Sequence, residues 1–470
     1  MIRFGTGGWR AIIGDEFIRS NIQILSKAMA LKMKNEGVSD QGMVIGYDRR
    51  FLSKEAMQWC AEVFAAEGIK TRLVSSSVPT PLIMSYVMEH KLPYGMMVTA
   101  SHNPAIYNGI KIFTSGGRDA NEAQTREIEQ YIDRIQGEVA IMDYEKAVDA
   151  GLIEIINPMN DYIDSILAKV DTNAIRERGL RIVIDPMYGV SLTALRTILL
   201  SCRCTVETIH ENHDTLFGGK MPAPNEATIR SLQNYVIDYH YDMGVATDGD
   251  ADRIGVVDDK GTFLTPNEVL VLLYYYLVKY KQWKGPVVRN IATTHMLDYI
   301  ANDFGEKCYE VPVGFKHISA QMRETGAIIG GESSGGLTVK GHIQGKDGIF
   351  AATLLAEMIA ITGKKISELM EEIHDTYGHL YMVEKSFRFD KERKKELEQL
   401  LSNEKCFPDF GFEIDHISYL DGCKIYFKNG GWIIARFSGT EPLLRVFCEM
   451  DQVETAEYTC QSLMNYLNLQ

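Results

Sequence analysis

The sequence lacks the patterns that identify several common classes of protein. Its eight cysteines include no Cys-x-x-Cys pair, so neither a zinc ribbon nor a dithiol redox motif is indicated. No Gly-x-x-x-x-Gly-Lys-Ser/Thr segment occurs, which excludes a Walker-type nucleotide loop. Scattered cysteines are typical of reduced, mostly buried thiols, and we therefore expect a cytoplasmic protein.

Long hydrophobic runs and an excess of positive charge are also missing. The longest apolar stretch, 269–278, contains three tyrosines and is too short to span a bilayer. Residues 1–6 hold no apolar signal core. The formal net charge is −14, which argues against nucleic acid as the main partner. We expect neither a nucleic-acid nor a membrane partner, and the sequence leaves a monomer and a homodimer both open.

The chain is long enough for several domains. Its 470 residues exceed the size of one hydrophobic core, and we expect three or four domains. Strand patterns at 43–47, 71–74 and 94–98 alternate with helical patterns, which predicts βαβ units and a largely parallel sheet. Two further units of this kind follow. Beyond about residue 375, short strands with glycine turns indicate an α+β domain.

The segment Asp-Gly-Asp-Ala-Asp-Arg at 248–253 is the most informative part of the chain. Three carboxylates alternate with small residues, and such a cluster of negative charge is costly unless a cation lies among them. Carboxylate oxygens are hard ligands, so the expected cation is Mg²⁺. Apolar segments precede and follow the motif, which places it at the end of a buried strand, where open α/β sheets bind their ligands.

The acidic segment also has alternatives to a Mg²⁺ site. An EF-hand loop requires Gly at its sixth position and Glu at its twelfth, but the chain has Arg253 and Asp259 there, and we reject that reading. A solvated acidic turn is the plain alternative, although such turns rarely interrupt two apolar strands. Taken alone, the segment also fits a hydrolase or a structural ion.

A second polar segment, Thr-Ala-Ser-His-Asn-Pro at 99–104, directly follows a predicted strand. The hydroxyl of Ser101 would project from the end of that strand. Serine is a poor nucleophile unless a base or a metal activates it, and His102 and Lys111 are candidate proton carriers. A cap between strand and loop, in which Asn-Pro begins a turn, is an equally good explanation.

Three glycine-containing segments are candidates for binding a phosphorylated sugar. Arg-Phe-Ser-Gly-Thr-Glu-Pro at 436–442, with Arg445 shortly after, combines arginines, hydroxyls and a glycine as an anion cradle would. Gly-Gly-Glu-Ser-Ser-Gly-Gly at 330–336 suits hydrogen bonding to several sugar hydroxyls. Gly-Thr-Gly-Gly-Trp-Arg at 5–10 allows close approach to a phosphate. An ordinary turn, a plain connector and a flexible start are the respective alternatives.

Taken together and in this order, the four motifs at 99–104, 248–253, 331–336 and 436–442 resemble the α-D-phosphohexomutase superfamily, of the phosphoglucomutase/phosphomannomutase type. The resemblance covers nearly the whole chain and extends to 5–10, 108–111, 314–317 and 346–348. It implies three similar α/β domains with mixed sheets plus a C-terminal α+β domain, arranged around a central cleft. We place these domains at 1–152, 153–253, 254–370 and 371–470.

The resemblance also implies a role for each motif. Ser101 would carry a phosphoryl group, and one Mg²⁺ per chain would be held by Asp248, Asp250, Asp252 and an oxygen of the phosphorylated Ser101. The remaining implied roles are proton transfer and charge neutralisation by Lys111, Arg10 and His102; charge balance near the phosphate by Arg253; contacts to the sugar by Lys316, His317, Glu332 and Ser334; and phosphate binding by Arg436, Ser438, Gly439, Thr440 and Arg445.

The implied reaction interconverts hexose 1-phosphate and hexose 6-phosphate through a hexose 1,6-bisphosphate. The Glu-x-Ser of the loop at 331–336 suits glucose or mannose phosphates and favours glucose 1-phosphate, with mannose 1-phosphate as a second substrate. The loop ends in Gly335-Gly336, where several relatives place Gly-His. A hexose 1,6-bisphosphate synthase, a phosphoglucosamine mutase and a non-catalytic phosphosugar-binding protein are the alternatives.

Overall fold

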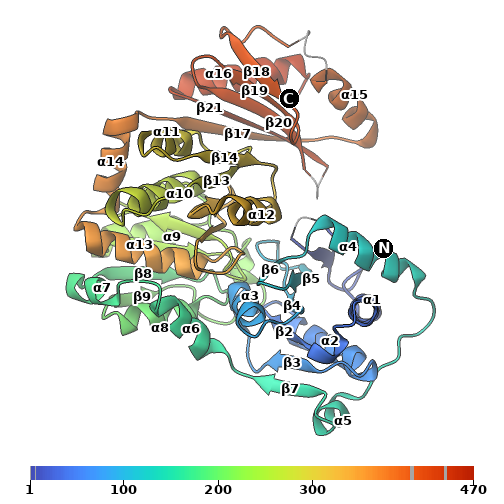
Figure 1. Cartoon of the computed structure of the whole chain (residues 1–470). Helices are drawn as coiled ribbons and strands as arrows, with labels where there is room; N and C mark the ends of the chain where they lie inside the picture. Colours follow the sequence, from blue (N-terminus) through green and yellow to red (C-terminus); the bar gives the residue numbers. More distant parts are fainter. Residues whose placement is uncertain (1, 6, 403–406, 439–441, 470) are drawn as a thin grey trace.

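The computed structural model describes residues 2–5, 7–402, 407–438 and 442–469. The strands of these residues form four sheets, which follow one another along the chain from the blue N-terminal part to the red C-terminal part (Figure 1). The first three sheets contain both parallel and antiparallel neighbours, and the fourth is antiparallel throughout. This arrangement confirms three α/β units followed by an α+β unit.

The first sheet has the order β1-β5-β4-β2-β3-β7, with β6 paired to β5. Its strands are β1 (Trp9–Ile12), β2 (Met43–Tyr47), β3 (Thr71–Val74), β4 (Tyr94–Val98), β5 (Tyr107–Thr114), β6 (Arg118–Asp119) and β7 (Ile153–Ile156). Its helices are α1 (Arg19–Asn35), α2 (Ser53–Ala66), α3 (Thr80–Glu89), α4 (Glu122–Arg134) and α5 (Tyr144–Asp149). The three predicted strands of this part, 43–47, 71–74 and 94–98, are therefore confirmed as β2, β3 and β4.

The second and third sheets have the orders β12-β11-β10-β8-β9 and β14-β13-β15-β16. Their strands are β8 (Arg181–Asp185), β9 (Thr205–Thr208), β10 (Met243–Thr247), β11 (Ile254–Val257), β12 (Phe263–Leu264), β13 (Val287–Asn290), β14 (Cys308–Val311), β15 (Ile329–Gly331) and β16 (Leu337–Val339). The accompanying helices are α6 (Met159–Leu167), α7 (Thr172–Arg178), α8 (Leu192–Ser201), α9 (Arg230–Tyr239), α10 (Pro266–Tyr275), α11 (Met296–Asp303), α12 (Phe315–Thr325), α13 (Gly348–Thr362) and α14 (Ile366–Tyr377).

The fourth sheet has the order β17-β21-β20-β19-β18. Its elements are β17 (Tyr381–Arg388), α15 (Lys391–Leu401), β18 (Ile414–Ser418), β19 (Cys423–Phe427), β20 (Trp432–Phe437), β21 (Leu443–Met450) and α16 (Val453–Tyr466). In this sheet the strands β18 to β21 form an antiparallel meander. The last strand, β21, also pairs with the first strand of the unit, β17.

Each predicted domain limit differs from the observed elements, two of them by strand pairing and the third by the position of a helix. The prediction began the second domain at 153, but β7 is parallel to β3 in the first sheet. It began the third domain at 254, but β11 forms a hairpin with β10 of the second sheet. The limit after residue 370 falls inside α14. Local patterns locate a strand but do not name its partner, so boundaries next to short strands were misplaced.

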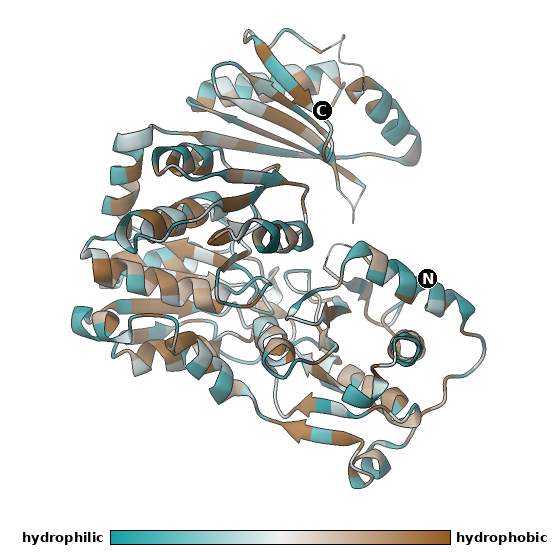
Figure 2. Cartoon of the chain, in the orientation of Figure 1, coloured by the Kyte–Doolittle hydropathy of each residue, from teal (hydrophilic) through white to brown (hydrophobic). Residues whose placement is uncertain are grey.

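The hydrophobic core is shared unevenly among the four sheets. One large cluster of buried apolar residues runs through the first three, and the fourth has a cluster of its own. Helix α13 follows the third sheet in sequence but packs against α7 and α8 of the second, and its apolar surface is visible in Figure 2. Among the described residues, no helix is both long and apolar enough to cross a membrane.

The fourth sheet is attached to the third through a small interface that contains a buried ion pair. Apolar residues from both sides meet there, among them Ile291 and Trp432. The side chain of Lys424 is fully buried, and its Nζ lies 2.7 Å from Glu310 Oε2 and 2.8 Å from the carbonyl oxygen of Ile291. The ammonium group also lies 4.0 Å from the centre of the Trp432 ring, which is a cation–π contact.

Substitution of Lys424 by Met tests this interface. We expect the free energy of unfolding to fall by about 1–3 kcal/mol, because Glu310 would lose one of two cationic partners while Arg289 Nη1 stays 2.5 Å from the same oxygen. Urea denaturation of the whole chain, followed by far-UV circular dichroism, measures the effect. Lys428→Met is the matched control: this side chain is 55% exposed and pairs with Glu413, and its loss should cost less than about 1 kcal/mol. Equal effects of the two substitutions would contradict the assignment.

Candidate active site

The four motif loops occupy equivalent places in the four sheets. Each one connects a strand to its antiparallel neighbour: 99–106 joins β4 to β5, 248–253 joins β10 to β11, and 332–336 joins β15 to β16. The last loop follows β20 and precedes β21, and it is described up to 438 and again from 442. The placement of these motifs at strand ends is thus confirmed.

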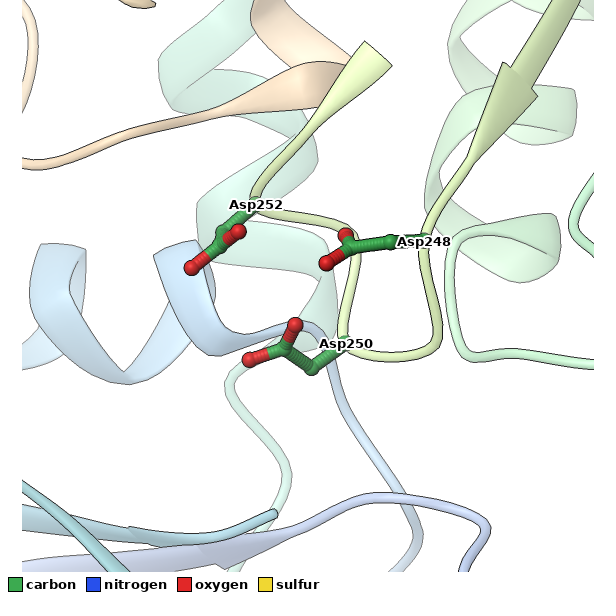
Figure 3. A group of neighbouring side chains, drawn as sticks. All are labelled: Asp248, Asp250 and Asp252. Atoms are coloured by element: carbon green, nitrogen blue, oxygen red, sulfur yellow. The ribbon is translucent and has the colours of Figure 1, made fainter. Parts of the chain in front are cut away.

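The three aspartates of the second loop converge. Asp248, Asp250 and Asp252 are all buried, and each offers one carboxylate oxygen to a group whose members lie within 4.8 Å of one another. Figure 3 shows the three carboxylates directed toward a common space inside the loop. Alternation with Gly249 and Ala251 allows this, since Ala251 has the left-handed φ of 64° that turns the chain around the group.

Positive side chains from three parts of the chain face these carboxylates. Lys111 Nζ, from β5, lies 2.6 Å from Asp250 Oδ2 and 2.7 Å from Asp252 Oδ2. Lys346 Nζ, from the segment before α13, lies 3.0 Å from Asp252 Oδ2. Arg253 Nε, within the loop itself, lies 3.9 Å from Asp252 Oδ1. The first and third sheets therefore both supply charge to a loop of the second.

The charge compensation is unequal among the aspartates. Burial and the neighbouring carboxylates Asp252 and Asp250 raise the pKa of Asp248 to about 7. Burial opposes ionisation of Asp252 as well, but Lys111 and Lys346 outweigh it and hold the pKa of Asp252 well below its usual range. Negative charge is consequently least satisfied at Asp248, whose Oδ2 accepts a hydrogen bond from a neutral hydroxyl.

The carboxylate group fits a divalent cation. Oδ1 of Asp250 and Oδ1 of Asp252 are buried and have no hydrogen-bond partner among the described residues. Buried carboxylate oxygens without a donor are costly, and a cation bound between them would remove that cost. The ligand atoms that this group offers are all carboxylate oxygens, which are hard ligands. They favour Mg²⁺ over metals that prefer nitrogen or sulfur ligands.

Ser101 lies beside this acidic group. Its Oγ donates a hydrogen bond of 2.7 Å to Asp248 Oδ2, and His102 Nδ1 lies 3.4 Å from the same Oγ. The backbone of Ser101 is left-handed, with φ of 52°, and its amide donates to Thr99 Oγ1 at 2.8 Å. A hydroxyl 147 residues earlier in the chain is thus brought against the carboxylates, as the motifs predicted.

Two residues that we did not assign to the site hold the serine loop in this conformation. The buried guanidinium of Arg50 donates to the carbonyl oxygens of Ser101 and Asn103, both at 2.6 Å. Asp48 accepts from Thr99 Oγ1 at 2.6 Å and from the amide of Arg50 at 2.9 Å. These residues directly follow the predicted strand 43–47, so their place at a strand end was the signal that could have identified them.

Thr80 and Lys346 also reach the acidic group without having been assigned a role. Thr80 Oγ1 lies 2.5 Å from Asp250 Oδ2, and its amide donates to the carbonyl oxygen of Asp250 at 2.9 Å. Lys346 belongs to a segment that resembles the superfamily, but it was given no function. Its stem passes over Gly336, where an added Cβ would lie 2.1 Å from Lys346 Cδ. Lys346 thereby connects Asp252 with the loop at 331–336, the predicted sugar-binding loop (hereafter the sugar loop).

Arg10 and His102 flank the serine as expected. Arg10 lies on β1, opposite Gly109 of β5, and its Nη1 donates to Asn103 Oδ1 at 2.6 Å. The pKa of His102 is well below its ordinary value, because Arg253 repels a second positive charge and burial and Arg10 add to that effect. For Lys111, burial would lower the pKa, but the adjacent aspartates Asp250 and Asp252 outweigh burial and raise it. The lysine therefore stays charged.

The predicted sugar-binding residues lie around the third sheet. Glu332 is buried, and its Oε1 accepts from the amide of Gly314 at 2.9 Å, whereas Ser334 is exposed. Lys316 and His317 open helix α12. Lys316 Nζ lies 2.5 Å from Glu122 Oε1 of α4, which links the third sheet to the first.

The predicted phosphate-binding residues lie on β20, on β21 and between them. Arg436 and Arg445 are direct cross-strand partners, so both side chains project from the same face of the sheet. Ser438 closes the end of the hairpin through a hydrogen bond of 2.8 Å from its amide to the carbonyl oxygen of Leu443. Gly439 and Thr440 lie outside the described residues.

Comparison with known proteins agrees with this geometry. Four family models match in order: phosphoglucomutase/phosphomannomutase alpha/beta/alpha domain I over 1–138, domain II over 160–261, domain III over 265–377 and the C-terminal domain over 388–465. The chain belongs to the phosphoglucomutase/phosphomannomutase family. It is accordingly a phosphomutase, an enzyme that transfers a phosphoryl group within its substrate.

The matches to similar family members extend over almost the whole length of both chains. The chain is 29% identical to the phosphoglucomutase/phosphomannomutase of Thermococcus kodakarensis, covering 96% of this chain and 95% of that protein. It is 30% identical to a protein of Methanosarcina acetivorans named "Probable phosphoglucosamine mutase", covering 95% and 94%. The fold also matches the open form of parafusin, a phosphoglucomutase from Paramecium, with a TM-score of 0.85, 19% identity and coverage of 100% and 96%. The names of these relatives differ in the sugar.

Replacement of Arg50 by Met tests the support beneath the serine loop. We expect the free energy of unfolding to fall by about 3–5 kcal/mol, because the buried Asp48, whose Oδ2 lies 3.4 Å from Arg50 Nε, would lose its cationic partner. Thermal and urea denaturation measure this loss. Arg126→Met, at a side chain that is 74% exposed, is the control and should change stability by less than about 0.5 kcal/mol. A fully stable Arg50→Met variant would show that the loop does not depend on the guanidinium.

Proposed function

We propose that the protein is a phosphohexomutase that interconverts hexose 1-phosphate and hexose 6-phosphate, with glucose preferred and mannose as a second substrate. The reaction passes through a phosphoserine at Ser101 and a bound hexose 1,6-bisphosphate. The observation that carries this proposal is the hydrogen bond of 2.7 Å between Ser101 Oγ and Asp248 within the buried acidic group. A serine in that position presents its hydroxyl, or a phosphoryl group attached to it, to a cation site.

Asp248, Asp250 and Asp252, together with an oxygen of phosphorylated Ser101, would hold one Mg²⁺. The ion supplies charge withdrawal from the phosphoryl group during its transfer. The remaining positive charge comes from the chain itself, because Lys111 bonds to two of the aspartates and Lys346 to one. Lys111 and Arg10 thus serve as charge-neutralising residues in this proposal.

The transfer step breaks the bond between phosphorus and Ser101 Oγ and forms a bond between phosphorus and a sugar hydroxyl oxygen. The hydroxyl proton must leave as that bond forms, and the serine oxygen must be protonated when it departs. His102, whose Nδ1 lies 3.4 Å from Ser101 Oγ, is placed to carry such a proton, while Lys111 stays charged beside Asp250 and Asp252. The step requires in-line positioning more than covalent chemistry by the protein.

The substrate is bound from the third and fourth sheets in this proposal. Glu332 and Ser334 hold sugar hydroxyls, with Lys316, His317 and Arg253 nearby. Arg436, Ser438, Gly439, Thr440 and Arg445 hold the distal phosphate. The bisphosphate must reorient between the two transfers, and arginines and backbone amides bind either phosphate equally well. The separate core of the fourth sheet suits a domain that releases and regrips the sugar.

The choice of sugar rests on the loop at 331–336, which suits glucose and mannose, while the relatives include proteins named for glucosamine phosphate as well. A panel of glucose, mannose and glucosamine 1-phosphates, each with Mg²⁺ and a trace of its 1,6-bisphosphate, ranks the substrates by kcat/KM. If kcat/KM is highest with glucosamine 1-phosphate, the preferred substrate is the aminosugar phosphate and not glucose 1-phosphate. Consumption of 1-phosphate without any 6-phosphate would instead favour a bisphosphate synthase.

Replacement of Ser101 by Ala is expected to abolish turnover, because no group would remain to carry the phosphoryl group. Formation of glucose 6-phosphate measures activity, and the intact mass of the purified protein reports whether one phosphoryl group is present in the wild type and absent from the variant. Ser402→Ala, at an exposed serine, should leave both readouts unchanged. Undiminished turnover in Ser101→Ala would exclude a phosphoserine at this position.

Asp250→Asn is expected to lower kcat by about 100-fold or more, since several kcal/mol of charge stabilisation in the transition state would be lost. The Mg²⁺ concentration needed for half-maximal rate should rise as well. Rates measured over a Mg²⁺ titration separate the two effects, and circular dichroism checks that the fold is intact. Asp133→Asn, at a side chain that is 51% exposed, serves as the control. Wild-type rate and Mg²⁺ dependence in Asp250→Asn would contradict the metal site.

A further inference from the structure

Asp421 joins the fourth sheet to the third at the point where substrate would be bound. It lies between β18 and β19, and its Oδ2 accepts a hydrogen bond of 2.7 Å from Arg436 Nε. The same oxygen accepts a hydrogen bond of 2.9 Å from the amide of Val313, at the third sheet. Both side chains of the ion pair are largely shielded, with 23% of Asp421 and 15% of Arg436 exposed.

The contact continues into the sugar loop. The next amide after Val313, that of Gly314, donates to Glu332 Oε1 at 2.9 Å. Gly314 has φ of 125°, a conformation that residues with a Cβ rarely adopt, so the turn depends on glycine. Two successive amides of one turn are thus held by two carboxylates, one from the fourth sheet and one from the sugar loop.

The ion pair also fixes the direction of Arg436. Arg436 and Arg445 face each other across β20 and β21, and two guanidinium groups on one face repel. Asp421 offsets the charge of Arg436, while Glu384 lies 3.9 Å from Arg445 Nη1. Because the bond to Asp421 uses Nε, both terminal NH₂ groups of Arg436 keep the geometry needed to bind a phosphate in bidentate fashion.

We propose that Asp421 is a positioning residue, which orients Arg436 toward the substrate's phosphate and couples that arginine to the sugar loop through Val313, Gly314 and Glu332. This inference rests on the proposed phosphohexomutase function and adds a residue to it. Asp421 touches no reacting atom and acts through Arg436. A guanidinium that is already oriented loses less freedom when the phosphate binds, so the proposal concerns affinity.

A competing role for Asp421 predicts a change of substrate affinity in the opposite direction. If Asp421 instead competed with the phosphate for Arg436, its neutralisation would release the guanidinium and tighten substrate binding. The direction of the change in affinity upon Asp421→Asn therefore distinguishes orientation from competition.

The experiment is a double-mutant cycle of Asp421→Asn and Arg436→Ala. Glucose 1-phosphate binding is measured by calorimetry in a Ser101→Ala background, and turnover is measured with Ser101 intact. We expect Asp421→Asn to raise Kd and KM about tenfold and to change kcat less than about twofold. In the Arg436→Ala background, the same change should alter Kd less than about twofold, because the group it positions is gone. Asp415→Asn, at a 55% exposed side chain on β18, is the matched control.

Three outcomes would overturn the proposal: an unchanged Kd in Asp421→Asn, a lowered Kd, or an equal effect of Asp421→Asn with and without Arg436. The last outcome also identifies plain structural damage, which would persist in the Arg436→Ala background. Absence of mutase turnover in the wild type would refute the proposed function instead. The binding cycle remains decisive in that case, because Kd is measured without turnover.

Discussion

The burial of three carboxylates in one loop is the constraint on which the arrangement of the first three sheets depends. Buried negative charge is tolerated only when positive charge or hydrogen-bond donors surround it. Here Lys111 and Thr80 come from the first sheet and its helices, Arg253 from the loop itself, and Lys346 from the segment before α13. No single sheet supplies all these groups, so the loop is satisfied only when the three sheets are packed together, as they are in the shared core.

The common position of the motif loops explains how a chain of this length assembles one site. Each loop connects a strand to an antiparallel neighbour, so each projects its side chains from the same kind of sheet edge. Repetition of the arrangement brings Ser101 against Asp248 although 147 residues separate them, and Lys346, which passes over Gly336 of the loop at 331–336, reaches Asp252. Figure 1 shows the second sheet, marked by β8 and β9, below the third, marked by β13 and β14, and the fourth sheet above the third.

The sequence was sufficient to predict much of this, and the exceptions share a physical cause. Buried parallel strands such as β2 and β4 are short apolar runs, so their limits at 43–47 and 94–98 were predicted correctly. The motif at 248–253 could be identified from the sequence, because three clustered carboxylates are costly unless a cation lies among them. Thr80 and Lys346 were missed as site residues because their partners Asp250 and Asp252 lie far away in the sequence, a relation that no local pattern expresses. The predicted domain boundary at 153 likewise separated β7 from the first sheet, since the pairing of β7 with β3 is decided by packing.

The fourth sheet obeys a different constraint. Among the described residues, it contributes nothing to the charge balance of the acidic loop, and it has its own apolar core. It meets the third sheet through apolar and aromatic side chains and the buried pair of Lys424 and Glu310. A phosphate arm on such a unit can change its position at little cost to the carboxylate group, because the buried aspartates keep their counter-charges throughout. Its polar ties to the third sheet include those of Lys424, Tyr426, Glu449 and Asp421, which fix a preferred orientation. Among the described residues, the charge of the acidic loop is balanced by the first three sheets, and in the proposed reaction the fourth sheet would be the unit that moves while a bisphosphate is released and gripped again.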